Sequence, residues 1–532
     1  MITFFKKNID LDKLFLITSI VFVVAFIIYS YSYNNYLPAY DAIAITRGTG
    51  GAAESGRWFI TLFFNYIGRF FGFYQVIPQA NLLMGYLLIA LSCYCLIKIF
   101  EIENKFHIVL ISAIYISSPA IADLVAWFYT FHAYCLSLFL ASLSVFVLIK
   151  VENIFVKYIL SFCLIVLSLA IYQAFLPVVT TILICKLILY SYDEKNDNAF
   201  LIKITIQYIL FVILGVLLYI ISCKISLAFL GSEMSGYGGM GNNVAPNYNI
   251  LKFAITVLKA FAIPFALAYT RYGSVNETLF SKVFIFIYLV LLIYTLFISL
   301  FKKDKFRKFF MFLLYISLPI SISLFKIMTP GGTAHRTVFS IILVFILPFV
   351  LFKEYFNKRV FKVFNVLVFV IAINLMFNDL GSSYNLFKGT KLIENWTNQL
   401  VAQVKGTDGY NVDMKVAMVG DPASYDKTVY WKGSDVNTTF NHAGIYNIFF
   451  EANYKKQYFF KECANYNYEM PEYVHFDNKD SINYSINTFY VLDDDGKRSL
   501  HSTDKRILDM PNYPNSGSIK IIDNVVVVKF SD

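Results

Sequence analysis

The residues with the most obvious chemical capacity lie in one polar, glycine-rich stretch, residues 36–58 of the 532-residue chain. It holds two carboxylates, two guanidinium groups and two aromatic rings: Asp41, Glu54, Arg47, Arg57, Tyr40 and Trp58. A carboxylate can act as a general base, a guanidinium can hold a phosphate through two hydrogen bonds, and an aromatic ring can stack on a sugar. We therefore predict that this stretch forms an active site.

Each acid of this stretch also has a structural explanation. Asp41 follows the first apolar segment, where it could cap a helix or stay solvated in a loop. Glu54 could begin the next helix, because a carboxylate is stabilised at the N-terminal end of a helix dipole. The structural explanation is the stronger one for Glu54, so Asp41 is the first candidate for a catalytic base.

Four further polar or aromatic residues lie at the ends of apolar segments: Trp127, His132, Gln173 and Arg336. Arg336 could bind phosphate, although an arginine at a membrane surface also extends its charge to water without any ligand. Trp58 and Trp127 could stack on a sugar or simply anchor the chain at the membrane boundary. His132 could donate to a substrate oxygen or complete a buried polar contact. The amide of Gln173, between two apolar segments, needs a partner that a sugar hydroxyl could supply.

The elements that must position these residues are membrane spans. The chain is 58% hydrophobic and only 15% charged, which is typical of a protein with many spans. A bilayer core of about 30 Å needs about 20 apolar residues for each crossing. Apolar segments near that length predict eleven helical spans: 14–33, 81–100, 107–121, 133–149, 154–171, 175–190, 202–229, 279–301, 309–327, 338–352 and 360–377.

The distribution of lysine and arginine predicts the orientation of these spans. With the N-terminus inside, the inside loops and their flanks hold 19 basic residues and the outside loops hold 10, and basic loops stay on the cytoplasmic side. An uncleaved first helix and an odd number of spans then place the 36–58 stretch and the C-terminal region outside the cytoplasm. This topology requires that the apolar stretches 59–74 and 251–269 do not cross the membrane.

The composition changes after residue 377. We therefore predict a transmembrane catalytic domain over 1–377 and a soluble extracytoplasmic α/β domain over 378–532. The first part carries 29 basic and 15 acidic residues, and the second carries 16 and 20. The net charge of +10 therefore comes from the basic loops of the membrane part and reflects their cytoplasmic orientation. Nucleic acid is not an expected partner.

The polar C-terminal region has a mixed α/β pattern. Residues 392–404 have a helical pattern, whereas 415–419, 488–492 and 524–530 are strand-like. The acidic run at 493–496 is interpreted as a solvated turn, because its spacing does not match a full set of calcium ligands. No cluster of cysteine and histidine predicts a metal site either.

Several short motifs, taken together, resemble a known family. They are Tyr40-Asp41, Ser55-Gly56-Arg57-Trp58, Ser118-Pro119 before Tyr129-Thr130-Phe131-His132, and Tyr172-Gln173-Ala174. The set is similar to the bacterial serotype-converting O-antigen glucosyltransferases, a family within the GT-C superfamily of membrane glycosyltransferases. The similarity covers the first third of the chain well, while the later spans and the C-terminal domain match mainly in layout.

The resemblance implies transfer of a glucosyl unit from polyprenyl-phosphate-glucose to a surface polysaccharide, such as the O-antigen of lipopolysaccharide, outside the bacterial cytoplasmic (inner) membrane. It implies Asp41 as the base of an inverting reaction, with Arg57 and Arg336 on the departing phosphate. The donor carries one phosphate, so no metal or other cofactor is expected. The family often has paired acids where this chain has Tyr40-Asp41, and it tends to have an acid at the position of His132.

The candidate site residues thus fall into three groups. The catalytic candidates are Asp41 and Glu54. The candidates for binding the donor phosphate are Arg57, Arg336 and Arg47. The candidates for contact with the sugar or the acceptor are Tyr40, Trp58, Trp127, His132 and Gln173.

A transporter or flippase of a lipid-linked saccharide is the main alternative. It predicts ionisable residues near the middle of the membrane and repeated halves with broken helices. The predicted spans hold few such charges, Lys186 and Lys224 lying near span ends, and no repeat is visible. A polymerase or ligase of O-antigen would favour a large outside loop between late spans, and a membrane-anchored binding protein would not need eleven spans.

Overall fold

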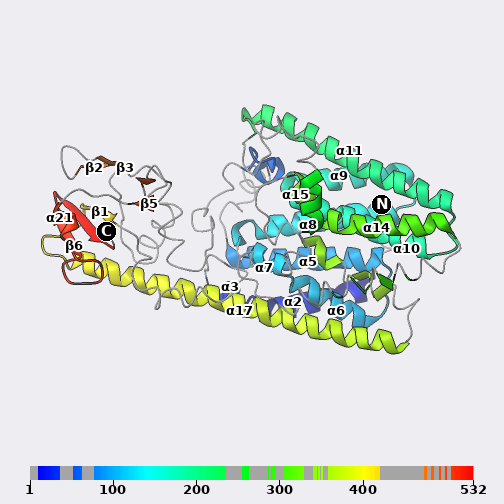
Figure 1. Cartoon of the computed structure of the whole chain (residues 1–532), viewed down its shortest axis with the longest axis horizontal. Coiled ribbons are helices and arrows are strands. Elements are labelled where there is room, and N and C mark those ends of the chain that lie inside the picture. Colours follow the sequence, from blue (N-terminus) through cyan, green and yellow to red (C-terminus); the bar gives the residue numbers. More distant parts are fainter. Residues whose placement is uncertain are drawn as a thin grey trace. The chain divides into compact units, whose positions relative to one another are not determined.

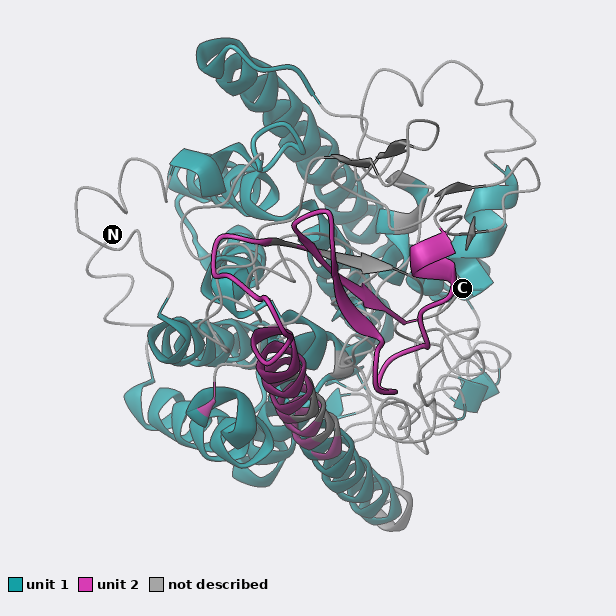
Figure 2. Ribbon diagram, turned by 90° about the vertical axis from the view of Figure 1, so that its left-hand side faces the viewer, with its two compact units in different colours: residues 1–34, 45–380 teal, residues 35–44, 381–532 magenta. Residues whose placement is uncertain are grey.

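A computed structural model of the chain describes these residues: 10–35, 52–62, 77–125, 127–234, 254–262, 304–328, 358–419 and 505–530, short pieces within 286–350, and four short strands between 473 and 499. The chain divides into two compact units (Figure 2). Unit 1 comprises residues 1–34 and 45–380, and unit 2 comprises residues 35–44 and 381–532. The assignment of catalysis to one part and of a soluble domain to the other stays a prediction.

Unit 1 is helical (Figure 1). Its elements in chain order are α2 (Leu11–Ile28), α3 (Ser30–Asn34), α4 (Trp58–Leu62), α5 (Pro78–Ile99), α6 (Lys105–Ile116), α7 (Pro119–Val125), α8 (Phe128–Lys150), α9 (Ile154–Ile171), η3 (Gln173–Phe175), α10 (Leu176–Tyr192), α11 (Asn198–Leu230), α14 (Lys305–Ile322), α15 (Leu324–Met328) and the first part of α17 (Lys358–Lys405). The helices α5, α8, α9 and α11 pack side by side in that order.

Seven helices within the described ranges are long and apolar enough to cross a membrane. They are Leu11–Ile28, Pro78–Ile99, Phe128–Lys150, Ile154–Ile171, Gln173–Tyr192, Asn198–Leu230 and Phe361–Lys388. The protein is therefore a polytopic helical membrane protein. The predicted total of eleven spans stays a prediction, and most of the predicted span 279–301 lies outside the described residues.

The predicted span over 107–121 is interrupted. Its helix α6 has 12 residues, or about 18 Å at 1.5 Å per residue, which is much less than the bilayer core of about 30 Å. The helix ends before Pro119 because proline has no amide hydrogen and disfavours helical backbone in the residue before it. Ser118 directly precedes α7, and its hydroxyl accepts a hydrogen bond from the amide of Ala120 at 3.3 Å. The prediction of one continuous span here is wrong.

The last predicted span does not end at residue 377, because α17 continues to Lys405 as one helix. Residues 378–391 contain no proline to stop it. Within this stretch the side chain of Asp379 is buried, and the hydroxyl of Tyr29 donates to its Oδ2 atom at 3.3 Å. The separate helix predicted over 392–404 is therefore the C-terminal part of α17.

Small and hydroxyl-bearing residues let the helices of unit 1 approach closely. A Cβ atom on Gly85 of α5 would lie 2.2 Å from a ring carbon of Phe131 in α8, so a larger residue does not fit. The hydroxyl of Ser92 lies 2.7 Å from the hydroxyl of Tyr115 and 2.8 Å from that of Ser142. These contacts join α5, α6 and α8 through their buried faces.

Unit 2 contains a three-stranded sheet in the order β1–β7–β6. Strand β1 (Lys415–Val419) is parallel to β7 (Val525–Lys529), and β6 (Ile519–Ile522) is antiparallel to β7. The indole of Trp396 in α17 packs against Phe530, with ring centroids 5.9 Å apart. The C-terminal part of α17 thus covers the end of this sheet.

Two small hairpins and one short helix complete the described part of unit 2. Strand β2 (Tyr473–His475) pairs with β3 (Ser481–Asn483), β4 (Val491–Leu492) pairs with β5 (Arg498–Ser499), and α21 covers Lys505–Leu508. The strands predicted over 415–419 and 524–530 are confirmed, and the one over 488–492 is confirmed in its last two residues. The acidic run 493–496 lies outside the described residues.

An ion pair between Glu101 and Lys150 joins the α5–α6 loop to the end of α8. The hydrogen bond from Lys150 lowers the pKa of the Glu101 carboxyl below its ordinary value of 4.5. A lowered folded-state pKa stabilises the fold above the unfolded pKa, and this contribution is lost as the pH falls through the folded pKa. We expect Glu101→Gln to lower the free energy of unfolding by about 0.2–1 kcal/mol at pH 7. The difference from wild type should shrink below about pH 4, which thermal unfolding in detergent at both pH values would check.

Candidate functional site

A pair of serines fixes two helices next to the candidate site. Ser137 in α8 and Ser168 in α9 each donate their hydroxyl to the backbone carbonyl of the other at 2.8 Å. Tyr134 lies about one turn from Ser137, and Tyr172 about one turn from Ser168. Their buried rings therefore meet and stack with centroids 4.4 Å apart. The result is a rigid aromatic wall at the N-terminal end of α8 and the C-terminal end of α9.

Arg57 lies against this aromatic wall. Its Nη1 atom donates to the hydroxyl of Tyr134 at 3.1 Å. Its guanidinium carbon lies 5.0 Å from the ring centroid of Tyr172, which is within cation–π distance. The side chain is half-buried. The guanidinium is therefore held in a fixed orientation at the end of the bundle, as a ligand for an anion requires.

A tight turn over residues 52–56 brings Arg57 to this position. The amide of Gly56 donates to the carbonyl of Ala53 at 2.8 Å, and that of Arg57 donates to the carbonyl of Ala52 at 2.9 Å. Gly56 has a φ of +78°, a left-handed conformation that glycine adopts without strain. The turn therefore depends on glycine at this position.

Two side chains from distant helices hold this turn, and we call their hydrogen bonds the turn anchor. The Nε2 atom of Gln173 donates to the carbonyl of Ser55 at 3.1 Å and to the hydroxyl of Tyr219 at 2.7 Å. That hydroxyl in turn donates to the carbonyl of Gly56 at 3.1 Å. The turn anchor thus connects η3 and α11 to the residues directly before Arg57.

Two buried polar atoms beside the turn make no hydrogen bond to any described residue: Nε1 of Trp58 and Oε1 of Gln173. Buried polar groups are normally hydrogen-bonded. One of these atoms is a donor and the other an acceptor, and a sugar hydroxyl can both donate and accept. The surroundings of Arg57 are therefore suited to a ligand that carries both an anion and hydroxyl groups.

The structure brings some of the predicted site residues together. Arg57, Trp58 and Gln173 gather around the turn. The side chain of Glu54 is exposed on the same turn. Trp127, directly before α8, and His132 within α8 are half-buried near the same end of that helix as Tyr134. Four predicted residues lie outside the described ranges: Tyr40, Asp41, Arg47 and Arg336.

The sequence analysis did not single out Tyr134 or Tyr219. Tyr219 lies on the buried stripe of α11, whose other face carries exposed apolar residues. Members of this stripe recur every three, four or seven residues: Leu201, Tyr208, Phe211, Gly215, Tyr219, Cys223 and Leu227. A tyrosine on the inward face of a span needs a hydrogen-bond partner. That signal could have identified Tyr219, although not its partner Gln173.

The fold and the site together define a helical membrane protein that presents a fixed guanidinium and an amide at one end of its bundle. The family described as glucosyl transferase GtrII matches residues 30–353, and the chain belongs to this family. The matched range includes Arg57, Tyr134, Gln173 and Tyr219. No curated protein and no solved structure matches the chain. The protein is therefore a membrane glucosyltransferase, which confirms the predicted family.

Proposed function

We propose that the protein moves a glucosyl unit from a polyprenyl-phosphate sugar to a surface polysaccharide such as O-antigen, on the extracytoplasmic side of the bacterial inner membrane. The observation that supports this most strongly is the fixed position of Arg57 against Tyr134 and Tyr172. A polyprenyl-phosphate donor keeps its phosphate at the membrane surface, because the lipid stays in the bilayer. A preoriented guanidinium at the end of a membrane bundle is suited to such a phosphate.

The proposed reaction is an inverting displacement. The carboxylate of Asp41 takes the proton of the acceptor hydroxyl while that oxygen attacks the anomeric carbon from the side opposite the phosphate. The bond between the anomeric carbon and the phosphate oxygen breaks, and its electron pair leaves on the lipid phosphate. Arg57, with Arg47 and Arg336, stabilises the charge that develops there.

The two buried atoms beside Arg57 support a place for the transferred sugar. Nε1 of Trp58 would donate to one sugar oxygen, and Oε1 of Gln173 would accept from a sugar hydroxyl. Tyr40, Trp127 and His132 are the further candidates for contact with the sugar or the acceptor. The single phosphate of the donor can be neutralised by arginine, so this mechanism requires no metal.

The test is transfer by the full chain in membrane vesicles supplied with polyprenyl-phosphate-[¹⁴C]glucose and a panel of lipopolysaccharide acceptors. We expect label to move to the polysaccharide, with the opposite anomeric configuration from the donor. UDP-glucose supplied alone should give no transfer. Movement of labelled donor across the vesicle membrane without transfer to any acceptor would contradict the proposal and identify a flippase instead.

A further inference from the structure

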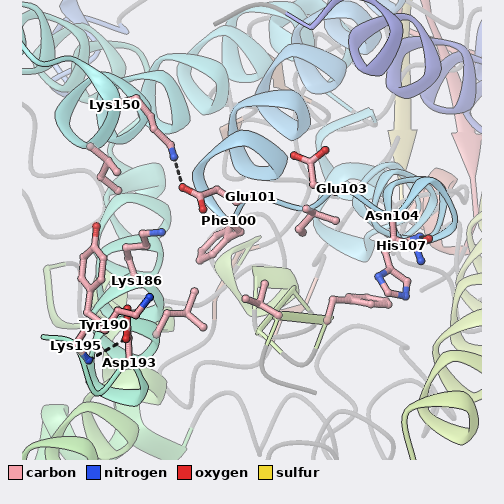
Figure 3. Close-up of a pocket in the computed structure, with 15 residues that line it drawn as sticks. Phe100, Glu101, Glu103, Asn104, His107, Lys150, Lys186, Tyr190, Asp193 and Lys195 are labelled. Atoms are coloured by element: carbon pink, nitrogen blue, oxygen red, sulfur yellow. Dashed lines mark hydrogen bonds and ion pairs between the residues drawn. The ribbon is translucent and has the colours of Figure 1, made fainter. Parts of the chain in front are cut away.

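A polar cavity of about 570 Å³, whose lining is drawn in Figure 3, is formed in part by residues near the C-terminal ends of α8 and α10. Its polar lining comes from the α5–α6 loop, the first turn of α6, the C-terminal parts of α8 and α10, and the residues directly after α10. Lys150 on α8 is about 24 Å along the helix from Tyr134, and Tyr190 on α10 is about as far from Gln173. The cavity and the Arg57 site therefore lie near opposite surfaces of the bilayer core.

The carboxylates that line this cavity already have partners. Glu101 forms an ion pair with Lys150, which Figure 3 shows, and Glu103 forms one with Lys13 of α2. The Oδ1 atom of Asp193 accepts a hydrogen bond from the amide of Lys195 at 3.0 Å. Each of these carboxylates therefore already has an ion-pair or hydrogen-bond partner.

Lys186 is the buried cation of the cavity, with a relative exposure of 8%. Its Nζ atom donates to the carbonyl of Ile99 at 3.2 Å and lies 5.1 Å from the ring centroid of Tyr190. No ion pair joins Lys186 to a carboxylate in the part of the chain that the structure describes.

The contact with Ile99 does not explain why a full charge is buried here. A backbone carbonyl at a helix end needs a donor but no cation. An ammonium has three N–H donors, and burying it without a direct ion pair is costly. Lys186 therefore has both the charge and the donor capacity for an anionic ligand inside the cavity.

We propose that this cavity binds one phosphate group, with Lys186 as its principal ligand. The ends of the membrane spans lie at the depth of the lipid phosphates, and basic pockets between spans bind acidic lipid head groups. Lys195, which lines the same cavity and is exposed, adds positive charge at its entrance. The phosphate belongs either to an anionic phospholipid or to a soluble phosphate. Because this site is separate from the Arg57 site, it does not depend on the proposed donor or acceptor.

The test compares thermal unfolding of the purified full chain in detergent with added dioleoylphosphatidylglycerol, dioleoylphosphatidylcholine or inorganic phosphate. The variants are Lys186→Gln and a matched control, Lys157→Gln. Lys157 lies in the first turn of α9, and its Nζ atom lies 5.8 Å from the ring centroid of Tyr158. It thus has the same kind of ring contact without lining the cavity.

We expect saturating phosphatidylglycerol to raise the unfolding midpoint of wild type and Lys157→Gln by about 5 °C more than phosphatidylcholine does. Lys186→Gln should lose most of this rise. A Lys186-dependent rise with millimolar inorganic phosphate, to which phosphatidylglycerol adds nothing, would support the phosphate site and identify the soluble source. An equal rise in all three proteins, or none in wild type, would overturn the proposal.

If Lys186→Gln does not fold, two further measurements still test the proposal. Lys186→Arg keeps the positive charge and should keep the phosphatidylglycerol effect. The preference of wild type for phosphatidylglycerol over phosphatidylcholine is measured without any variant. Loss of the effect in Lys186→Arg, with the fold intact, would count against a phosphate ligand, because arginine binds phosphate at least as well as lysine.

Discussion

Replacing Asp41 with asparagine is expected to lower the rate of glucosyl transfer by about a hundredfold or more, with normal protein level and normal donor binding. Asparagine keeps the size and shape of aspartate but cannot take a proton from the acceptor hydroxyl. The phosphate ligands and the sugar contacts are unchanged, so the loss should appear in kcat and leave the KM for the donor nearly constant. Transfer from polyprenyl-phosphate-glucose to lipopolysaccharide in membrane vesicles measures both constants.

The matched control for this change is Glu54→Gln, which removes the other carboxylate of the same stretch. The side chain of Glu54 is exposed on the turn that leads to Arg57, so its loss should change transfer by less than about threefold. Unchanged transfer in Asp41→Asn would remove Asp41 from the mechanism. If Glu54→Gln then abolished transfer, the role of base would pass to Glu54.

Span positions could be predicted from the sequence because the length of an apolar segment is a local property. The span predicted over residues 154–171 coincides with α9. The end of the last span could not be predicted in this way. Polar residues are frequent in 378–391, yet α17 continues through them to Lys405. Within this stretch the buried Asp379 accepts a hydrogen bond from Tyr29, which is distant in sequence. The composition of a segment does not show which distant residue will form a hydrogen bond with it.

The candidate site could be predicted only in part, for the same reason. The sequence analysis inferred that Gln173, between two apolar segments, needs a partner for its amide and named a sugar hydroxyl. In the structure this side chain is buried, and its Nε2 atom donates to the hydroxyl of Tyr219. Its partner Tyr219 belongs to another helix, and only the packing of that helix brings the two together. The fixed orientation of Arg57 depends likewise on Tyr134 and Tyr172, which meet because Ser137 and Ser168 join their helices.

Gly56→Ala is expected to lower glucosyl transfer by about tenfold to a hundredfold, because it displaces the turn that positions Arg57. A Cβ atom at this position would lie 2.5 Å from the hydroxyl oxygen of Tyr219 and 2.7 Å from Nε2 of Gln173. These are the two atoms of the turn anchor, so they cannot both keep their hydrogen bonds while the methyl group is present. The change should affect transfer more than protein level, since it falls in one short turn at the end of the bundle.

The matched control is Gly231→Ala at the C-terminal end of α11. Gly231 has a φ of +62°, so alanine there carries the same kind of backbone strain, about 1 kcal/mol, but its Cβ atom would meet no described atom within 4 Å. Transfer by this variant should stay close to that of wild type, and equal losses in both glycine variants would show that general strain, not the turn anchor, is responsible. Adding Tyr219→Phe to Gly56→Ala removes the nearer of the two clashing atoms. If the clash causes the loss, the double variant should lose less activity than the two single losses combined, since the substitutions act on one contact.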